Sequence, residues 1–190
     1  MTKIGEYYFR NDVEWRNWLH ANHDKVSGVN LIFYKVDHEN DSMRWEEAVK
    51  VALCYGWIDS TVKSLGDGKR QQYFCPRKSK STWSKRNKKH IKALIKSGLM
   101  HESGMKKIAA AKRDGSWTLL DDVENGVIPV DLDKAFKKNS IAFQNFQNFT
   151  LSQKKSYLYW LKQAKREETR QKRINEIISL CAENIKRRTV

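Results

Sequence analysis

The stretch of residues 45–75 places a helix directly before a β-hairpin, and this order strongly constrains the fold. Within residues 45–55, apolar side chains recur at the three- and four-residue spacing of an amphipathic helix, and Gly56 follows as a typical C-terminal glycine. Residues 57–75 are predicted to form two strands joined by the turn signal Gly66-Asp67-Gly68. A helix that leads into a hairpin needs a sheet to pack against, so the segment indicates an α+β fold.

Elsewhere the pattern is helical apart from one more strand. Residues 29–36, VNLIFYKV, are rich in β-branched and aromatic side chains, which predicts a strand between Gly28 and a polar loop. The sequence therefore predicts an α+β domain over residues 1–120, with a small antiparallel sheet of about three strands and flanking helices. A linker at residues 121–130 and a helical bundle over residues 131–190 are predicted to follow.

Positive charge is concentrated in two regions of the chain. The formal net charge is +15 at pH 7, and residues 77–113 alone carry 13 Lys and Arg against one Glu. Residues 154–190 carry 11 basic and 4 acidic side chains, whereas residues 1–76 are close to neutral. Such a field attracts anionic or phosphate-bearing partners. A lysine-rich surface that only keeps the protein soluble explains the same pattern, so both interpretations stay open.

The sequence favours a protein without a membrane anchor. No apolar run approaches the roughly 20 residues of a membrane-spanning helix, and the N-terminus lacks a stretch typical of signal peptides. The cysteines Cys54, Cys75 and Cys181 are far apart and form no C-x-x-C pair, which favours small buried side chains over a zinc or redox site. We therefore expect a cytoplasmic protein without a metal, without another cofactor and without membrane insertion.

The segment of residues 54–87 gathers side chains that a binding pocket needs. The candidate ligand-binding residues are two tryptophans, an acid, two arginines and two small polar residues, namely Trp57, Asp59, Arg70, Arg77, Trp83, Ser84 and Asn87. In this hypothesis the tryptophans provide stacking faces and the arginines provide charge for an anionic or phosphate-bearing ligand. Ser84 and Asn87 would donate hydrogen bonds to the same ligand.

These residues also have a purely structural interpretation. Alternation along the strand predicts that Asp59 and Val62 lie on opposite faces. Asp59 is then placed to pair with Arg77 and to stabilise the loop after the hairpin. Ser84 is suited to cap a helix predicted at residues 85–97, and the N-terminus of that helix is also suited to an anion. The clustering of five of these residues, Asp59, Arg77, Trp83, Ser84 and Asn87, favours a functional pocket.

Several spaced runs of sequence resemble one known family. The runs are EEAVKVALCYGWIDS from Glu46, PRKSKSTWSKRN from Pro76, GLMHESG from Gly98, AKRDGSW from Ala111 and AKREETRQKRI from Ala164. They resemble the bacterial YdeI/OmpD-associated family, whose C-terminal helical module is the bacteriocin-protection domain. The sequence departs from that pattern at Cys75, where we expect a threonine, and at Arg44, where a helix-capping Ser or Thr is usual.

The resemblance implies an association with resistance to bacteriocins or antimicrobial peptides, and it implies no catalytic residue and no cofactor. Antimicrobial peptides are mostly cationic, so a chain of charge +15 should not capture them through its overall charge. We favour a non-catalytic binding or accessory protein with a pocket for an anionic ligand. The alternatives are a nucleic-acid-binding protein that uses residues 77–113 and 154–190, and an enzyme with Asp59 as general acid or base.

Overall fold

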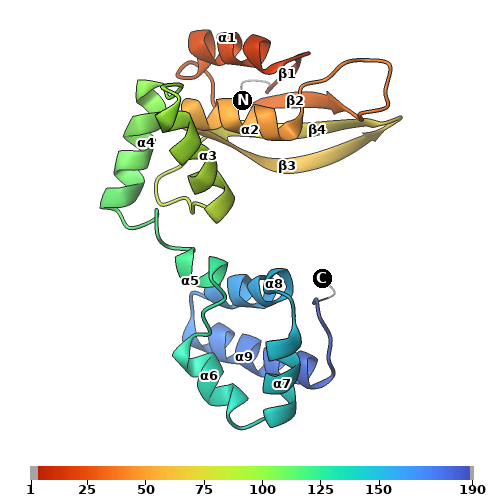
Figure 1. Cartoon of the computed structure of the whole chain (residues 1–190), viewed down its shortest axis with the longest axis vertical. Helices are drawn as coiled ribbons and strands as arrows, with labels where there is room; N and C mark the ends of the chain where they lie inside the picture. The colour runs from red at the N-terminus through yellow and green to blue at the C-terminus, as the bar shows by residue number, and fades with distance from the viewer. Residues whose placement is uncertain (1–3, 189–190) are drawn as a thin grey trace. The chain divides into compact units, whose positions relative to one another are not determined.

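The computed structural model describes residues 4–188, which form two compact units with their boundary in the sequence between Thr118 and Leu119 (Figure 1). The elements of the first unit are β1 (Gly5–Tyr8), α1 (Asp12–Asn22), β2 (Val29–Tyr34), α2 (Trp45–Cys54), β3 (Trp57–Gly66), β4 (Lys69–Pro76), α3 (Lys85–Lys96) and α4 (Glu102–Arg113). The elements of the second unit are α5 (Asp121–Glu124), α6 (Val130–Phe136), α7 (Ser140–Asn148), α8 (Leu151–Lys162) and α9 (Glu167–Ala182). Each unit has a hydrophobic core of its own.

The sheet of the first unit has four strands in the order β1-β2-β4-β3. β1 runs parallel to β2, whereas the pairs β2–β4 and β3–β4 are antiparallel. The predicted α+β class is confirmed, but the sheet is mixed and has a fourth strand that was not predicted. The missed strand is only 4 residues long. Its parallel pairing depends on the crossover through α1, which no local sequence signal reveals.

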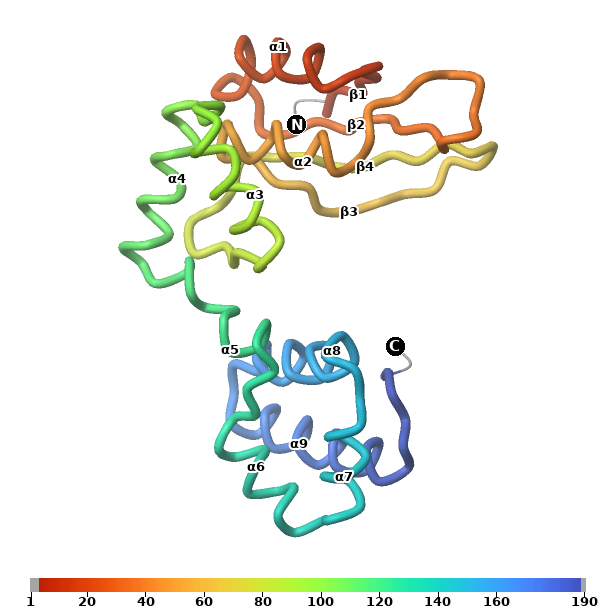
Figure 2. Tube along the Cα trace, in the orientation of Figure 1, coloured from red at the N-terminus to blue at the C-terminus, as the bar shows by residue number. Residues whose placement is uncertain are grey.

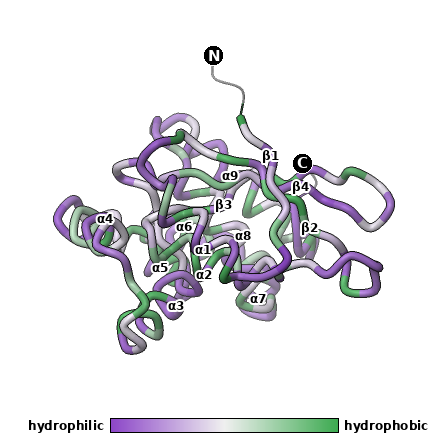
Figure 3. Tube along the Cα trace, turned by 90° about the horizontal axis from the view of Figure 1, so that it is seen from above, coloured by the Kyte–Doolittle hydropathy of each residue, from purple (hydrophilic) through white to green (hydrophobic). Residues whose placement is uncertain are grey.

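Helices α1 and α2 pack together against the sheet (Figure 2). Trp15 on α1 is fully buried, and its ring centroid lies 5.8 Å from that of Phe74 on β4. The Nε1 of Trp15 donates a hydrogen bond to the Ala48 carbonyl of α2 at 3.2 Å. Figure 3 shows β2 as a mainly hydrophobic strand followed by a hydrophilic loop. Because Phe74 packs against the buried Trp15, the face of the sheet that carries Phe74 is the core face.

A β-bulge in β3 changes which side chains reach the core face. Asp59 pairs with Phe74 and Val62 pairs with Gln72, so one extra residue is inserted in β3 between the two pairs. Phe74 and Gln72 are two residues apart on β4 and share a face, and Asp59 and Val62 therefore share it too. The prediction that Asp59 and Val62 lie on opposite faces is wrong for this reason.

The second unit consists of helices around a core rich in aromatic side chains, including Phe136, Phe146 and Tyr157. Residues 121–130, which were predicted to be a linker, belong to this unit, because they contain α5 and bury Val123 in its core. α5 packs against α8, and Ile128 of the same segment also packs against this core.

No helix within residues 4–188 is long and apolar enough to cross a membrane. The cysteines Cys54 and Cys181 are buried, Cys75 is partly buried, and none of the three forms a disulfide. Burial raises the pKa of Cys181 to about 12 and raises the pKa of Cys54 as well. Both thiols therefore stay protonated and poorly reactive at neutral pH.

Candidate ligand-binding groove

An open groove lies at the end of the sheet that carries the β3–β4 turn, beside the N-terminus of α2. Its volume of ≈ 610 Å³ falls within the range of about 300–1,000 Å³ that is typical of small-molecule sites. The apolar part of its wall is formed by Phe33, Tyr34, Val36, Met43, Trp45 and Val62. Phe33 pairs with Arg70 on the core face, so the groove continues the core face beyond the part that α2 covers.

The groove is bordered mainly by positive charge. Four of its lining residues are cationic, namely Lys35, Arg44, Lys69 and Arg70. Asp67 is the single acid among the described residues that line it. The guanidinium carbon of Arg70 lies 5.4 Å from the ring centroid of Phe33, which keeps an exposed cation next to an aromatic wall. The arrangement is complementary to a ligand with an apolar body and a negative group.

Trp45 is a fixed aromatic part of this wall. Its Nε1 donates a hydrogen bond to Asp59 Oδ2 at 2.9 Å, and the side-chain amide of Gln72 donates to the same oxygen. On α3, the guanidinium carbon of Arg86 lies 5.6 Å from the Trp45 ring centroid. Asp59 is not among the residues that line the groove. Its carboxylate therefore acts by positioning Trp45.

The two tryptophans that were predicted as stacking faces are both buried. Trp57 is 1% exposed, its ring lies edge-on to that of Trp15, and its Nε1 donates to the His23 carbonyl at 3.1 Å. Trp83 is 2% exposed and lies under the guanidinium of Arg77. Neither ring has an open face for a ligand in the groove, because the fold uses both rings in its core.

The remaining predicted residues are divided between the two ends of β4. Arg70 lies at the turn end and lines the groove, whereas Arg77 follows the other end and lines a separate, smaller cavity. Seven residues of extended chain separate them by about 23 Å. Ser84 Oγ accepts a hydrogen bond from the Asn87 backbone N–H at 3.2 Å, so these two residues form the N-terminal cap of α3.

Sequence patterns do not identify Val36, Trp45 and Val62 as groove residues. The spacing of Trp45 and the strand pattern around Val62 are those of core residues. Val36 is nevertheless 79% exposed and Val62 52% exposed. Periodicity shows which residues share a face, but it does not show how far along a sheet the covering helix extends. A useful signal is an apolar residue next to a cation just after a strand, as at Lys35 and Val36, which follow the end of β2 at Tyr34.

Three histidines of the first unit lie close together. The ring centroid of His101 lies 6.0 Å from that of His20 and 4.8 Å from that of His23. Among residues 4–188, no group of three or more His, Cys, Asp or Glu residues is arranged to hold a metal ion. His101 has a structural role, because its Nδ1 accepts a hydrogen bond from the Ser103 backbone N–H at 3.2 Å and caps α4.

The stability of the first unit is expected to fall as the pH drops below about 6.5. Burial, followed by the charges of His23 and His20, lowers the pKa of His101 below its unfolded value. Stabilisation by neutral His101 is therefore present above the unfolded pKa and is lost as the pH falls through the folded pKa. Melting temperatures at about pH 7.5 and about pH 5 measure this loss.

The variant His101→Asn tests the assignment, since asparagine keeps an N-cap acceptor and does not titrate. The variant should lose less melting temperature than the wild type over the same pH interval. His90, whose pKa burial also lowers, should leave part of the pH dependence in place. If the pH dependence were the same in both proteins, His101 would not be its source.

The fold and the groove define a two-unit protein, in which an α+β unit with a cation-bordered groove precedes a helical unit. Residues 7–107 match a domain of unknown function, DUF8412, and residues 125–184 match the family described as bacteriocin-protection, YdeI or OmpD-associated. The chain belongs to the DUF8412 family, and its likeness to the bacteriocin-protection, YdeI or OmpD-associated family is confined to the C-terminal part. No curated protein and no solved structure matches the chain.

The predicted family is thus confirmed for the C-terminal part of the chain. The runs from Glu46, Pro76 and Gly98, which carried much of the resemblance, lie within the DUF8412 match. The groove also lies in that unit.

Proposed function

We propose that the first unit is a binding module for a small amphipathic anion, meaning a molecule with an aromatic or aliphatic body and a carboxylate, sulfonate or phosphate group. The observation that carries the proposal is the groove of ≈ 610 Å³, which combines an apolar wall with four cationic residues and one acid. Bulk charge alone would attract any anion. The apolar wall adds a preference for anions that also have a hydrophobic body.

The two parts of the groove contribute differently to affinity. The apolar body of the ligand would be buried against Tyr34, Trp45 and Val62, and each buried CH₂ group is worth about 0.8 kcal/mol. The cations are solvent-exposed or partly so, and an exposed ion pair contributes about 0.2–1 kcal/mol. Hydrophobic contact therefore supplies most of the affinity, and the cations select the charge of the ligand.

A pair of fluorescent probes that differ in charge tests this proposal. The full-length protein should bind the anion 8-anilinonaphthalene-1-sulfonate saturably and more tightly than the uncharged N-phenyl-1-naphthylamine. In Arg70→Gln, affinity for the sulfonate should fall about two- to fivefold, the equivalent of one exposed ion pair. Affinity for the uncharged probe should not change.

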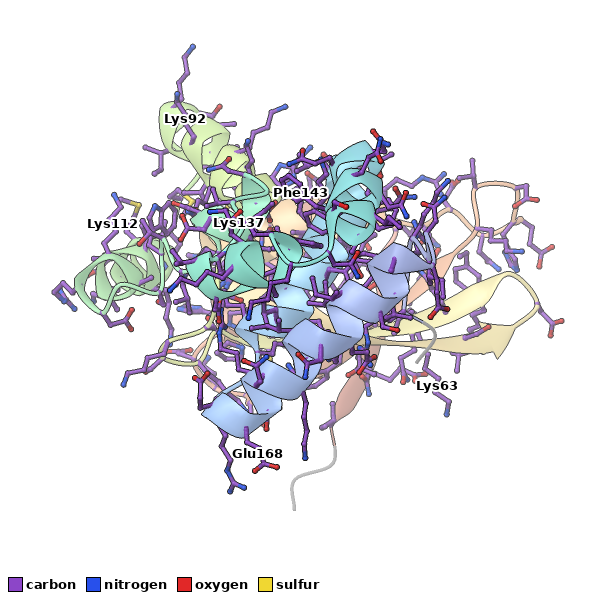
Figure 4. The ribbon with its side chains drawn as sticks, turned by 90° about the horizontal axis from the view of Figure 1, so that it is seen from below. Lys63, Lys92, Lys112, Lys137, Phe143 and Glu168 are labelled. Atoms are coloured by element: carbon purple, nitrogen blue, oxygen red, sulfur yellow. The ribbon has the colours of Figure 1, made fainter. Side chains whose placement is uncertain are left out.

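Lys63→Gln is the matched control for Arg70→Gln. Lys63 lies on the same hairpin and pairs with Gln71, on the face opposite the groove. Figure 4 shows its side chain pointing away from the hairpin ribbon. This variant removes the same charge and should leave both affinities unchanged. Equal losses in Arg70→Gln and Lys63→Gln would mean that bulk charge, not the groove, attracts the probe.

A protective role of the kind that the family description suggests would depend on such an anionic ligand. Direct capture of cationic peptides by the whole chain is opposed by its net charge of +15. The protein would instead take part in protection through the anionic ligand bound in its groove, and not by capturing the cationic peptide itself.

The nucleic-acid alternative rests on basic residues interleaved with aromatic ones in residues 77–113 and 154–190, which include the lysines of α3, α4, α8 and α9. Figure 4 shows Lys92 on α3 extending away from the ribbon, as expected for a solvated lysine face. The enzyme alternative depends on Asp59, whose Oδ2 is engaged by Trp45 and Gln72. The amphipathic anion is therefore the better supported ligand class.

A further inference from the structure

Arg77 is a buried cation held firmly at the end of β4. It is 3% exposed, its backbone N–H donates to the Gly56 carbonyl at 2.9 Å, and its own carbonyl accepts from Lys107 Nζ at 2.8 Å. Its guanidinium carbon lies 3.6 Å from the ring centroid of Trp83, so the guanidinium covers that ring. With both backbone groups bonded and the side chain stacked, Arg77 has little freedom to reach solvent.

One edge of this guanidinium has no protein partner. Nη1 donates to the Thr82 carbonyl at 3.0 Å and to Ser81 Oγ at 3.4 Å. Nε and Nη2 are buried and form no hydrogen bond with any of residues 4–188. The N–H groups of Nε and Nη2 point in parallel from one edge of the plane, and such a pair of donors matches a carboxylate or phosphate in a bidentate contact.

No carboxylate among residues 4–188 forms an ion pair with Arg77. The charge of Asp59 acts on Arg77, but the Oδ2 of Asp59 accepts its hydrogen bonds from Trp45 and Gln72. Burial lowers the pKa of Arg77 to about 10, and the charges of Asp59 and Cys75 oppose that decrease. Arg77 therefore remains charged at neutral pH, in a buried place where an unpaired charge is unfavourable.

A small, positively charged cavity adjoins Arg77. Its volume is ≈ 60 Å³, and it lies between the loop of residues 77–83, α4 and the turn that follows α4. Its charged lining consists of Arg77, Lys78, Lys80 and Lys107 with Asp114 as the single acid among the described lining residues. Sites that enclose organic ligands are typically about 300–1,000 Å³, so this cavity suits a small ion or a single phosphate group.

We infer that this cavity binds a phosphate group, held in a bidentate contact by the Nε and Nη2 donors of Arg77. The neighbouring lysines add attraction without the fixed geometry that the guanidinium provides. The site lies at the opposite end of β4 from Arg70 and does not depend on the groove or on its ligand. The ring centroids of Trp83 and Trp117 are 5.1 Å apart beside Arg77, so binding should change tryptophan fluorescence.

Titration of the full-length protein with sodium phosphate, against sodium chloride at matched ionic strength, tests the inference. Phosphate should produce a saturable change in tryptophan fluorescence and a rise in melting temperature, whereas chloride should produce neither. Arg77→Lys keeps the positive charge but loses the pair of parallel donors. Its affinity for phosphate should be at least about tenfold lower than that of the wild type.

Two further variants make the result decisive. Arg77→Met keeps an unbranched side chain over Trp83 without charge and should show no response to phosphate. If it does not fold, Arg77→Lys decides alone. Arg70→Gln should keep the full phosphate response, which separates failure of this site from failure of the groove.

A comparison with glycerol 3-phosphate identifies the source of the phosphate group. If only free phosphate produces the response, the cavity binds the inorganic ion. If phosphate and glycerol 3-phosphate produce equal responses, the cavity accepts a phosphoryl group on a larger molecule. The inference is overturned if the wild type responds no more to phosphate than to chloride. It is also overturned if the response persists in the Arg77 variants, since surface lysines would then be its cause.

Discussion

Gly104→Ala is expected to destabilise the first unit by about 2–4 kcal/mol, as measured by urea denaturation. A Cβ added at Gly104 on α4 would lie 2.1 Å from the Cys54 carbonyl oxygen and 2.8 Å from its carbon, both of which are backbone atoms. The same carbonyl accepts a hydrogen bond from the His101 backbone N–H at 3.1 Å, so it cannot move without loss. Helix α4 would have to separate from the end of α2.

Helix propensity alone gives the opposite expectation for this substitution. Alanine is favoured over glycine in a helix by about 1 kcal/mol, so an uncrowded site would gain stability. Gly98→Ala is a useful control, because a Cβ there meets no atom within 4 Å and only the positive φ of 65° opposes it. That variant should lose about 1–2 kcal/mol. Stabilisation by Gly104→Ala would show that α2 and α4 do not pack this closely.

Trp57→Ala should have a comparable or larger effect, with a loss of about 3–5 kcal/mol in the free energy of unfolding. Trp57 is 1% exposed, and its ring centroid lies 6.2 Å from those of both Trp15 and Trp18. Truncation would leave a cavity between α1 and the sheet, and it would leave the His23 carbonyl without its donor. Since small domains are stable by only about 5–15 kcal/mol, much of the margin would be lost.

Trp57→Phe separates the structural role of this residue from a role in ligand binding. Phenylalanine keeps an aromatic ring in the core and removes the Nε1 donor, so a loss of about 1–3 kcal/mol is expected from the unpaired carbonyl. Affinity for 8-anilinonaphthalene-1-sulfonate should not change, because Trp57 does not line the groove. A variant of unchanged stability but weaker binding would restore the stacking role predicted from the sequence.

The candidate site was only partly predictable, and Arg70 and Asp59 show why. Arg70 was a candidate and lines the groove, because a residue beside a hairpin turn is placed by local signals alone. Asp59 was also a candidate, but it does not line the groove, and its Oδ2 accepts hydrogen bonds from Trp45 and Gln72. Spacing in sequence brought Arg70 and Arg77 into one predicted pocket, whereas the length of β4 holds them at opposite ends.

The sequence by itself determined the α+β class, the order of helix and hairpin, and the helical C-terminal part with its family resemblance. These features depend on periodicity, turn glycines and local runs, which are properties of neighbouring residues. Tertiary structure alone decided the parallel pairing of β1, the shared face of Asp59 and Val62, and the burial of Arg77. Each of these depends on a crossover, a single inserted residue, or contacts between segments distant in the chain, and no local pattern records them.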